Sequence, residues 1–215
     1  MELEGKCALV TGGGRGIGRA IAAALSCAGA DVAIIGRTEA TLRQTAAALG
    51  GHGRRVWHGV ADVGVPAQVE QVVQTLAASW GHLDILVNNA GVQGPIGPLV
   101  TTPADRWWDA VRTNLLGCYA CCRAVLPGML ERGYGKIVNL SGGGAVTPRP
   151  RYSAYSASKA AVVRLTETLA AELAGTGIEP PGRLPTCCAR WAGGTRAWSS
   201  CSRSSARACC SSRVA

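Results

Sequence analysis

The sequence predicts an α/β fold in which helices cover both faces of a doubly wound, parallel β-sheet. Short apolar runs alternate with segments of helical periodicity along most of the chain, and this alternation implies right-handed crossovers between parallel strands. A glycine-rich loop at residues 11–18 separates the first apolar run from the first helical segment. The 215 residues, of which 47% are hydrophobic, suffice for one substantial core.

Each expected element follows from a short local pattern. Apolar runs predict buried strands at 6–10, 31–35, 55–60, 83–87 and 137–141. Helical patterns follow them at 19–28, 39–49, 66–80, 107–125 and 157–173. Pro66 suits the first turn of the third helix, where a backbone N–H is not needed. Ligands bind beyond the carboxyl ends of strands in such sheets, so we expect the residues that follow the strands to gather at one edge.

The glycine-rich loop reads Thr11-Gly-Gly-Gly-Arg-Gly-Ile-Gly18. A strand, a glycine turn and a helix in this order form the context of a dinucleotide site. Glycines let the backbone approach a pyrophosphate, and the helix N-terminus presents free N–H groups. Such a loop on its own is equally compatible with a tight turn, and the flanking strand and helix favour the dinucleotide site.

A second motif, Tyr155-Ser-Ala-Ser-Lys159, stands at the start of a helical pattern. Positions four apart share a helix face. A lysine ammonium held near a tyrosine hydroxyl favours the phenolate, so that the hydroxyl can donate and accept a proton near neutral pH. The alternative is an ordinary helix start with two surface side chains.

Together these segments resemble the short-chain dehydrogenase/reductase family, and the 3-oxoacyl-carrier-protein reductases within it. The spacing of Gly12, Gly16 and Gly18 is that of the family, and the resemblance covers residues 1 to about 178. The other landmarks follow in order: Asp62-Val63, Asn88-Asn-Ala-Gly91, Asn114, Ile137-Val-Asn-Leu-Ser141, Tyr155 and Lys159. The resemblance implies a Rossmann-type, three-layer αβα fold, here incomplete at its C-terminal end.

The resemblance also implies the function, hydride transfer between a nicotinamide and a carbonyl or alcohol. Tyr155 would be the general acid and base, Lys159 would assist it, Asn114 would hold a water that links Lys159 to solvent, and a serine would polarise the carbonyl. The cofactor would be bound by Gly12, Arg15, Gly16, Ile17, Gly18, Arg37, Asp62, Val63, Asn89, Ala90, Gly91, Tyr155 and Lys159. No metal site is expected. A small ketone or a 3-oxoacyl thioester is the broadest substrate class that the resemblance suggests.

Charge favours NADP(H) over NAD(H). NAD sites commonly place an acid after the second strand, whereas an arginine there suits a 2′-phosphate. Here Arg37 follows that strand, no acid does, and Arg15 adds a second cation in the glycine loop. Two cations favour a dianionic phosphate.

The serine departs from the family pattern. The family places it thirteen residues before the tyrosine, a position that is Gly142 here, and Ser141 lies one residue upstream. Neighbours on an extended segment point to opposite sides. Ser141 is therefore either the catalytic serine or a strand-end side chain that bonds backbone, and Ser153 is a remote substitute.

Residues 1–179 are expected to form the dinucleotide-binding and catalytic domain, and residues 180–215 an atypical tail. The tail begins Pro180-Pro181 and contains five Cys, six Arg, seven Ser and no acid. We interpret it as out of register with the family sequence. Two other functions therefore stay open: a cofactor-binding protein with weak or no catalysis, and a protein that interacts through its basic tail.

The remaining expectations concern location and partners. No 18-residue apolar run and no signal-peptide pattern is found, so we expect a cytoplasmic protein that binds a small molecule, without membrane or nucleic-acid partners. The helices at 107–125 and 157–173 are apolar over wide arcs, which favours a homodimer or homotetramer. Cys118, Cys121 and Cys122 are expected to pack in the core.

Overall fold

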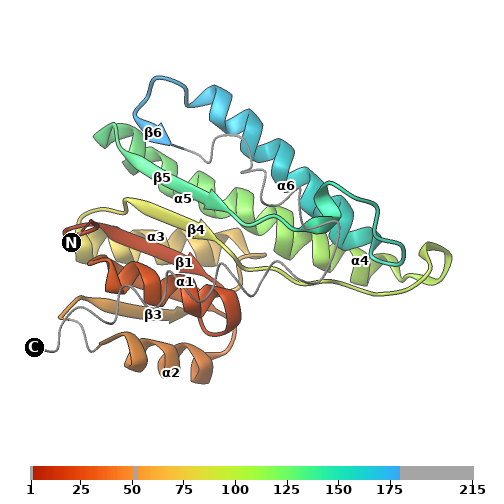
Figure 1. The fold of residues 1–215 in the computed structure, drawn as a ribbon, viewed down its shortest axis with the longest axis horizontal. Helices are drawn as coiled ribbons and strands as arrows, with labels where there is room; N and C mark the ends of the chain where they lie inside the picture. Colours follow the sequence, from red (N-terminus) through yellow and green to blue (C-terminus); the bar gives the residue numbers. More distant parts are fainter. Residues whose placement is uncertain (1, 51–52, 180–215) are drawn as a thin grey trace, which may run out of the picture. The chain divides into compact units, whose positions relative to one another are not determined.

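A computed structural model of the chain describes residues 2–50 and 53–179. Within this part six strands form one sheet in the order β3-β2-β1-β4-β5-β6 (Figure 1). Every neighbouring pair of strands is parallel. The strands are β1 (Cys7–Thr11), β2 (Asp31–Gly36), β3 (Val56–Val60), β4 (Ile85–Asn88), β5 (Gly135–Asn139) and β6 (Ile178–Glu179). The order reverses between β1 and β4, and this switch point is where ligands bind in open α/β sheets.

Helices connect the strands in sequence. They are α1 (Gly16–Cys27), α2 (Glu39–Leu49), α3 (Pro66–Trp80), α4 (Ala104–Val111), α5 (Gly117–Arg132) and α6 (Ser153–Glu172). A π-helical segment, Arg112–Leu116, joins α4 to α5. Short 3₁₀ helices lie at Leu99–Thr101 and Gly143–Ala145. The doubly wound α/β fold that the sequence predicted is therefore confirmed.

Two apolar cores lie on opposite faces of the sheet. Side chains of α1 and α2, among them Ala22 and Leu42, pack with Val10 and Ile34 on one face. Side chains of α3, α5 and α6 pack with Leu9, Leu86 and Ile137 on the other. The alternation along each strand sends successive side chains to opposite faces, so two continuous apolar surfaces arise from one set of strands.

The expected and observed elements differ mainly at their ends. Helices α2 and α3 have the expected bounds, whereas α1 begins three residues earlier, at Gly16. The single helix expected at 107–125 is interrupted by the π-helical segment, and α5 runs on to Arg132 with Pro127 inside it. A proline there forfeits one backbone hydrogen bond, but Val125 and Met129 are buried and anchor the helix on the sheet.

The described chain ends in a two-residue strand. β6 pairs with β5 through Ile178 and Glu179 only. Val138, on the face of β5 away from the α3, α5 and α6 core, is 42% exposed. The expected tail at 180–215 lies outside the described residues. Among the helices of the described part, none is long and apolar enough to cross a membrane.

Candidate active site

The carboxyl ends of β1, β4 and β5 bring the expected site residues together. Thr11 ends β1, Asn88 ends β4 and Asn139 ends β5, and all three are buried. The glycine loop follows β1, Asn89-Ala90-Gly91 follows β4, and Ser141 comes two residues after β5. The tertiary structure therefore assembles segments about 130 residues apart in sequence at one edge of the sheet, as a doubly wound topology requires.

The glycine loop contains backbone conformations that favour glycine. Gly12 and Gly16 have φ values of +65° and +55°, a region that favours glycine. A Cβ at Gly12 would lie 2.8 Å from the Asn89 side-chain nitrogen, and one at Gly18 would collide with the Gly12 carbonyl. A Cβ at Gly16 would meet nothing within 4 Å, so this side of the loop is open. No side chain among residues 2–50 and 53–179 caps α1, which leaves its first N–H groups available to an anion such as a pyrophosphate.

Thr11 and Asn89 fasten this loop to the end of β4. The Thr11 hydroxyl accepts hydrogen bonds from the backbone N–H groups of Asn89 and Ala90, at 3.1 and 3.0 Å. The Asn89 side-chain amide donates to the carbonyls of Thr11 and Gly12, at 2.9 and 3.2 Å. The two loops that would flank a dinucleotide are thereby held as one unit.

The remaining residues expected to bind cofactor occupy different environments. Arg15, Ile17 and Arg37 are exposed, and neither arginine pairs with an acid in the described part of the chain. Asp62 turns the chain after β3, because its carboxylate accepts from the Gly64 N–H at 2.9 Å. Val63 is buried in the core and packs against α5.

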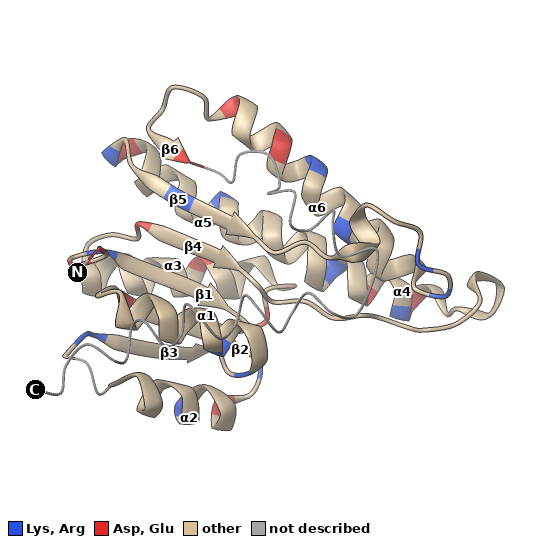
Figure 2. Cartoon of the chain, viewed as in Figure 1, with Lys and Arg blue, Asp and Glu red and all other residues tan. Residues whose placement is uncertain are grey.

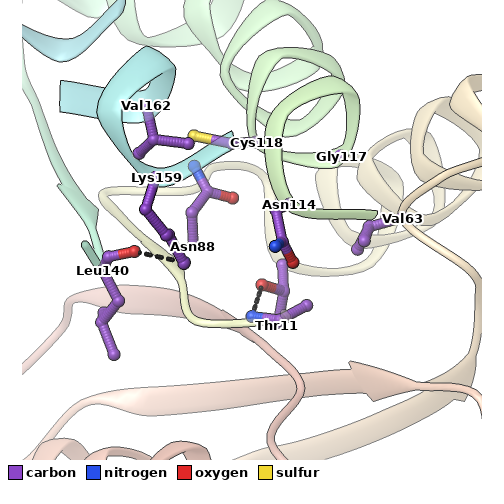
Figure 3. A pocket seen from close by; sticks show the side chains of 10 residues that line it. Thr11, Val63, Asn88, Asn114, Gly117, Cys118, Leu140, Lys159 and Val162 are labelled. Atoms are coloured by element: carbon purple, nitrogen blue, oxygen red, sulfur yellow. Dashed lines mark hydrogen bonds between the residues drawn. The ribbon is translucent and has the colours of Figure 1, made fainter. Parts of the chain in front are cut away.

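Tyr155 and Lys159 lie one turn apart in the first half of α6. The Lys159 ammonium is buried and donates to the Leu140 carbonyl, which follows β5, at 2.7 Å (Figure 3). Burial lowers the pKa of Lys159 from its ordinary value of 10.5. The lysine is thus held at the switch point, with its neutral form more accessible than in water.

Asn114 lies in the π-helical segment and positions two neighbouring segments. Its side-chain oxygen accepts from the Val92 N–H at 2.8 Å, and its amide donates to the Val92 carbonyl and the Ser158 hydroxyl, both at 2.9 Å. These contacts connect the loop after β4 to α6, one residue before Lys159. Both amide hydrogens of Asn114 have protein acceptors, and its oxygen accepts one of the two bonds that an amide oxygen can accept.

The side chains of Lys159 and Asn114 approach the backbone of Gly91. A Cβ added at Gly91 would lie 3.2 Å from the Asn114 side-chain oxygen and 3.5 Å from the Lys159 nitrogen. Beside them is a cavity of about 10 Å³, roughly the space that one water molecule needs. Asn88 also lines this cavity (Figure 3). Its side-chain oxygen is buried, with no hydrogen-bond partner in the part of the chain that the structure describes.

The surroundings of Ser141 differ from those of a strand-end serine that bonds backbone. Its hydroxyl is buried and has no hydrogen-bond partner among the described residues. Gly142 lies against the Tyr155 ring, because a Cβ there would overlap the phenol hydroxyl and lie 3.1 Å from the carbon that bears it. Ser153 accepts a hydrogen bond from the Trp107 indole at 3.1 Å.

The structure adds a polar network that sequence reasoning did not single out. The Asn88 amide donates to the Asn139 side-chain oxygen at 2.8 Å and to the Cys122 sulfur at 3.4 Å, and Asn139 donates to Thr166 of α6 at 2.9 Å. The two asparagines are the last residues of adjacent strands, and this shared position is the sequence feature that could have predicted their contact. Cys118, Cys121 and Cys122 are buried in the core, as expected.

A cluster of possible metal ligands lies at the beginning of β1 and β4. The Cys7 thiol, the His82 ring and the Asp84 carboxylate have ligand atoms within 4.8 Å of one another. The carboxylate accepts from the Cys7 N–H at 2.9 Å and lies 3.1 Å from His82 and 3.5 Å from Arg132. We interpret Asp84 as a structural tie between the two strands.

Comparison with known proteins shows the family. The sequence model of the family described as short chain dehydrogenase matches residues 6–189, which extends beyond residue 178, where we expected the resemblance to end. This chain belongs to the short chain dehydrogenase family. Its members are NAD(P)-dependent oxidoreductases with the Rossmann-type fold described above.

Three similar proteins show the range within the family. A short chain dehydrogenase of Pseudocercospora fijiensis is 40% identical over 82% of this chain and 58% of its own length. An NAD⁺-bound xylitol dehydrogenase is 33% identical with a TM-score of 0.81, over 84% of this chain and 69% of its own. An actinorhodin polyketide ketoreductase variant with NADPH is 39% identical with a TM-score of 0.79, over 81% of this chain and 67% of its own. The chain thus spans less than two thirds of the fungal dehydrogenase.

Proposed function

We propose that this short chain dehydrogenase is an oxidoreductase that interconverts a carbonyl group and an alcohol, with NADP(H) preferred over NAD(H). The observation that carries the proposal is the position of Tyr155 and Lys159, one helical turn apart, with the lysine fixed at the strand edge where the glycine loop lies. When bound, the nicotinamide supplies or accepts the hydride. The residues of the chain bind the cofactor, orient the substrate and transfer the proton.

Tyr155 is the proposed proton donor during reduction and the acceptor during oxidation. The Lys159 ammonium, on the same face of α6, stabilises the phenolate that is left when the proton departs. The pKa of Lys159, which burial lowers, also makes proton release from its ammonium easier. The one-water cavity beside Lys159 supports a route by which that proton is replaced.

Ser141 is proposed to polarise the substrate carbonyl. Its hydroxyl is a donor without a partner within the described protein, and an unpaired buried hydroxyl is costly unless a ligand satisfies it. Asn114 is a positioning residue in this proposal, because its side chain bonds Val92 and Ser158 and so fixes α6 against the loop after β4.

The proposed cofactor site uses the glycine loop for the pyrophosphate and arginines for the 2′-phosphate. The open surface at Gly16 and the uncapped N-terminus of α1 suit an anion. Arg37 follows β2 where an acid would favour NAD(H), and Arg15 immediately precedes α1. Both guanidinium groups are exposed and available to a phosphate.

The test is titration of the protein with NADPH, followed by fluorescence, and then assay with a panel of small ketones. We expect saturable NADPH binding and ketone-dependent oxidation of NADPH. Tyr155→Phe should bind NADPH with an unchanged Kd and lose at least about 100-fold in kcat. Turnover retained in this variant would refute Tyr155 as the proton donor.

One observation favours a second candidate, a cofactor-binding protein with weak catalysis. The residue thirteen positions before Tyr155 is a glycine that packs against the phenol, so no side chain at that position can contact a substrate. Tight NADPH binding without turnover of any ketone would favour this candidate.

Association into a homodimer or homotetramer is also proposed. Trp108, Leu116 and Tyr119, in α4, the π-helical segment and α5, are 59%, 36% and 45% exposed. Large apolar side chains that gather on neighbouring helices are typical of interfaces. Light scattering measures the molecular mass, and a monomer at micromolar concentration would rule this out.

A further inference from the structure

Arg149 lies beside the proposed proton donor and has no counterion among the described residues. Its guanidinium carbon is 4.3 Å from the centre of the Tyr152 ring and 5.7 Å from the centre of the Tyr155 ring. Seven arginines of the described chain pair with acids, namely Arg43, Arg54, Arg55, Arg112, Arg123, Arg132 and Arg164, whereas Arg149, like Arg15 and Arg37, does not. Arg149 makes no ion pair or hydrogen bond through its guanidinium with any described residue.

The segment that carries Arg149 is held in place. Pro148 and Pro150 flank the arginine and restrict its backbone. The Tyr152 N–H donates to the Arg149 carbonyl at 3.1 Å, and the Gly97 N–H donates to the Arg151 carbonyl at 2.9 Å. The loop before α6 is therefore attached to the loop after β4, and the guanidinium is presented from a restrained backbone.

The contact with Tyr152 leaves the guanidinium able to bind an anion. The guanidinium carbon lies over the Tyr152 ring, and its N–H groups bond no described residue. These N–H groups lie in one plane and can form the two parallel bonds that a carboxylate accepts. The contact with the ring also reduces the side-chain entropy lost when an anion binds.

The charge around Tyr155 favours the same conclusion. Residues 142–152 include two arginines and no acid. In Figure 2 basic residues mark the loop that leads into α6. A negatively charged group near Tyr155 would therefore meet Arg149 and no carboxylate from residues 142–152.

We propose that Arg149 forms an anion subsite of the active site, so that the preferred substrates are small oxo acids whose carboxylate lies a few bonds from the reacting carbonyl. The proposal rests on the oxidoreductase function proposed above. The carbonyl is held at Tyr155 while the carboxylate accepts two parallel hydrogen bonds from the Arg149 guanidinium. The reaction at the carbonyl is unchanged: hydride adds to the carbonyl carbon and the Tyr155 proton to the oxygen.

The test compares acetoacetate with methyl acetoacetate, which have the same ketone and differ in one negative charge. We expect the wild-type protein with NADPH to favour acetoacetate in kcat/KM. Arg149→Gln should lower kcat/KM for acetoacetate at least about tenfold, mainly through KM, and change that for the ester less than about twofold. The kcat/KM of Arg149→Lys for acetoacetate should lie between those of the wild type and Arg149→Gln. Lysine keeps the positive charge but cannot form the two parallel hydrogen bonds of a guanidinium.

Arg164→Gln is the matched control, because Arg164 is an exposed arginine of α6 that pairs with Glu167. It should behave as wild type with both ketones. Equal losses for acid and ester in Arg149→Gln, or no loss for either, would overturn the subsite.

A binding measurement separates this subsite from the proposed function. Calorimetric titration of acetoacetate into the NADP⁺-saturated protein requires no turnover. If neither ketone is reduced but acetoacetate binds and Arg149→Gln abolishes that binding, the subsite stands and the proposed reaction fails. If acetoacetate does not bind the wild-type protein, the subsite itself is refuted.

Discussion

The Lys159 ammonium donates a 2.7 Å hydrogen bond to the carbonyl of Leu140, the residue that follows β5. This bond connects α6 to the edge of the sheet and fixes the cation beside Gly91 and Asn114. The Lys159 side chain is buried, so folding removes a charged group from water, which is energetically unfavourable. Such a cost is typical of functional sites.

Lys159→Met should change how stability depends on pH. The pKa of Lys159 is lowered by burial from 10.5, so between the lowered value and 10.5 the unfolded chain binds more protons than the folded one. Wild-type stability therefore rises with pH across this window, because the folded lysine loses its buried charge there. Below the window the penalty is fully present and constant.

The measurement is urea unfolding of both proteins from pH 7 to 10.5. The wild-type protein should gain stability relative to Lys159→Met as the pH rises. A difference that stays constant, or that falls with pH, contradicts the buried-cation interpretation.

Gly142→Ala should displace Tyr155. The added methyl group would overlap the phenol hydroxyl, so we expect a fall in kcat of about tenfold or more and a loss of about 1–3 kcal/mol in the free energy of unfolding. Gly143→Ala is the control, because a Cβ there meets nothing within 4 Å. Ketone assays and urea unfolding give both quantities, and equal effects at the two glycines would show that the packing against Tyr155 is unimportant.

Asn89→Ala should loosen the glycine loop. It removes the side-chain bonds to the carbonyls of Thr11 and Gly12, which leaves partly buried acceptors unsatisfied at a cost of about 1–3 kcal/mol. We expect a lower free energy of unfolding and a Kd for NADPH raised about tenfold. Ser79→Ala, which removes one exposed hydrogen bond of α3, is the control and should keep NADPH affinity.

Arg37→Ala should weaken NADPH binding selectively. Loss of one charge-assisted contact to the 2′-phosphate is expected to raise the Kd for NADPH about tenfold and to leave that for NADH unchanged. Calorimetry with both cofactors measures this. Arg43→Ala on α2, where Arg43 pairs with Glu39, controls for the loss of a positive charge. Tighter NADH than NADPH binding by the wild-type protein would reverse the cofactor assignment.

The helix expected at 107–125 shows where sequence reasoning reaches its limit. The apolar periodicity predicted one helix, but the π-helical segment at 112–116 shifts the register by a residue within it. Local pattern does not reveal this shift, although the segment carries a side chain that bonds distant groups. Asn114 bonds Val92 in the preceding loop and Ser158 in α6.

Ser141 and Arg149 illustrate the same limit within the site. Sequence spacing left two interpretations of Ser141, and the buried, unpaired hydroxyl is visible only in three dimensions. Arg149 looks like an ordinary surface cation in the sequence. Its place above Tyr152 and near Tyr155 depends on how the loop before α6 folds back.

By itself, the sequence determined the family, the doubly wound fold and the segments from which the site is built. Hydrophobic periodicity, glycine spacing and the residues that follow strands are local properties, which can be read directly from the order of residues. The tertiary structure decided which side chains are buried, which are paired and which remain free for a ligand. Those properties depend on groups from separate segments of the chain, as Lys159 meets Leu140 and Gly91, and no local pattern records such distances.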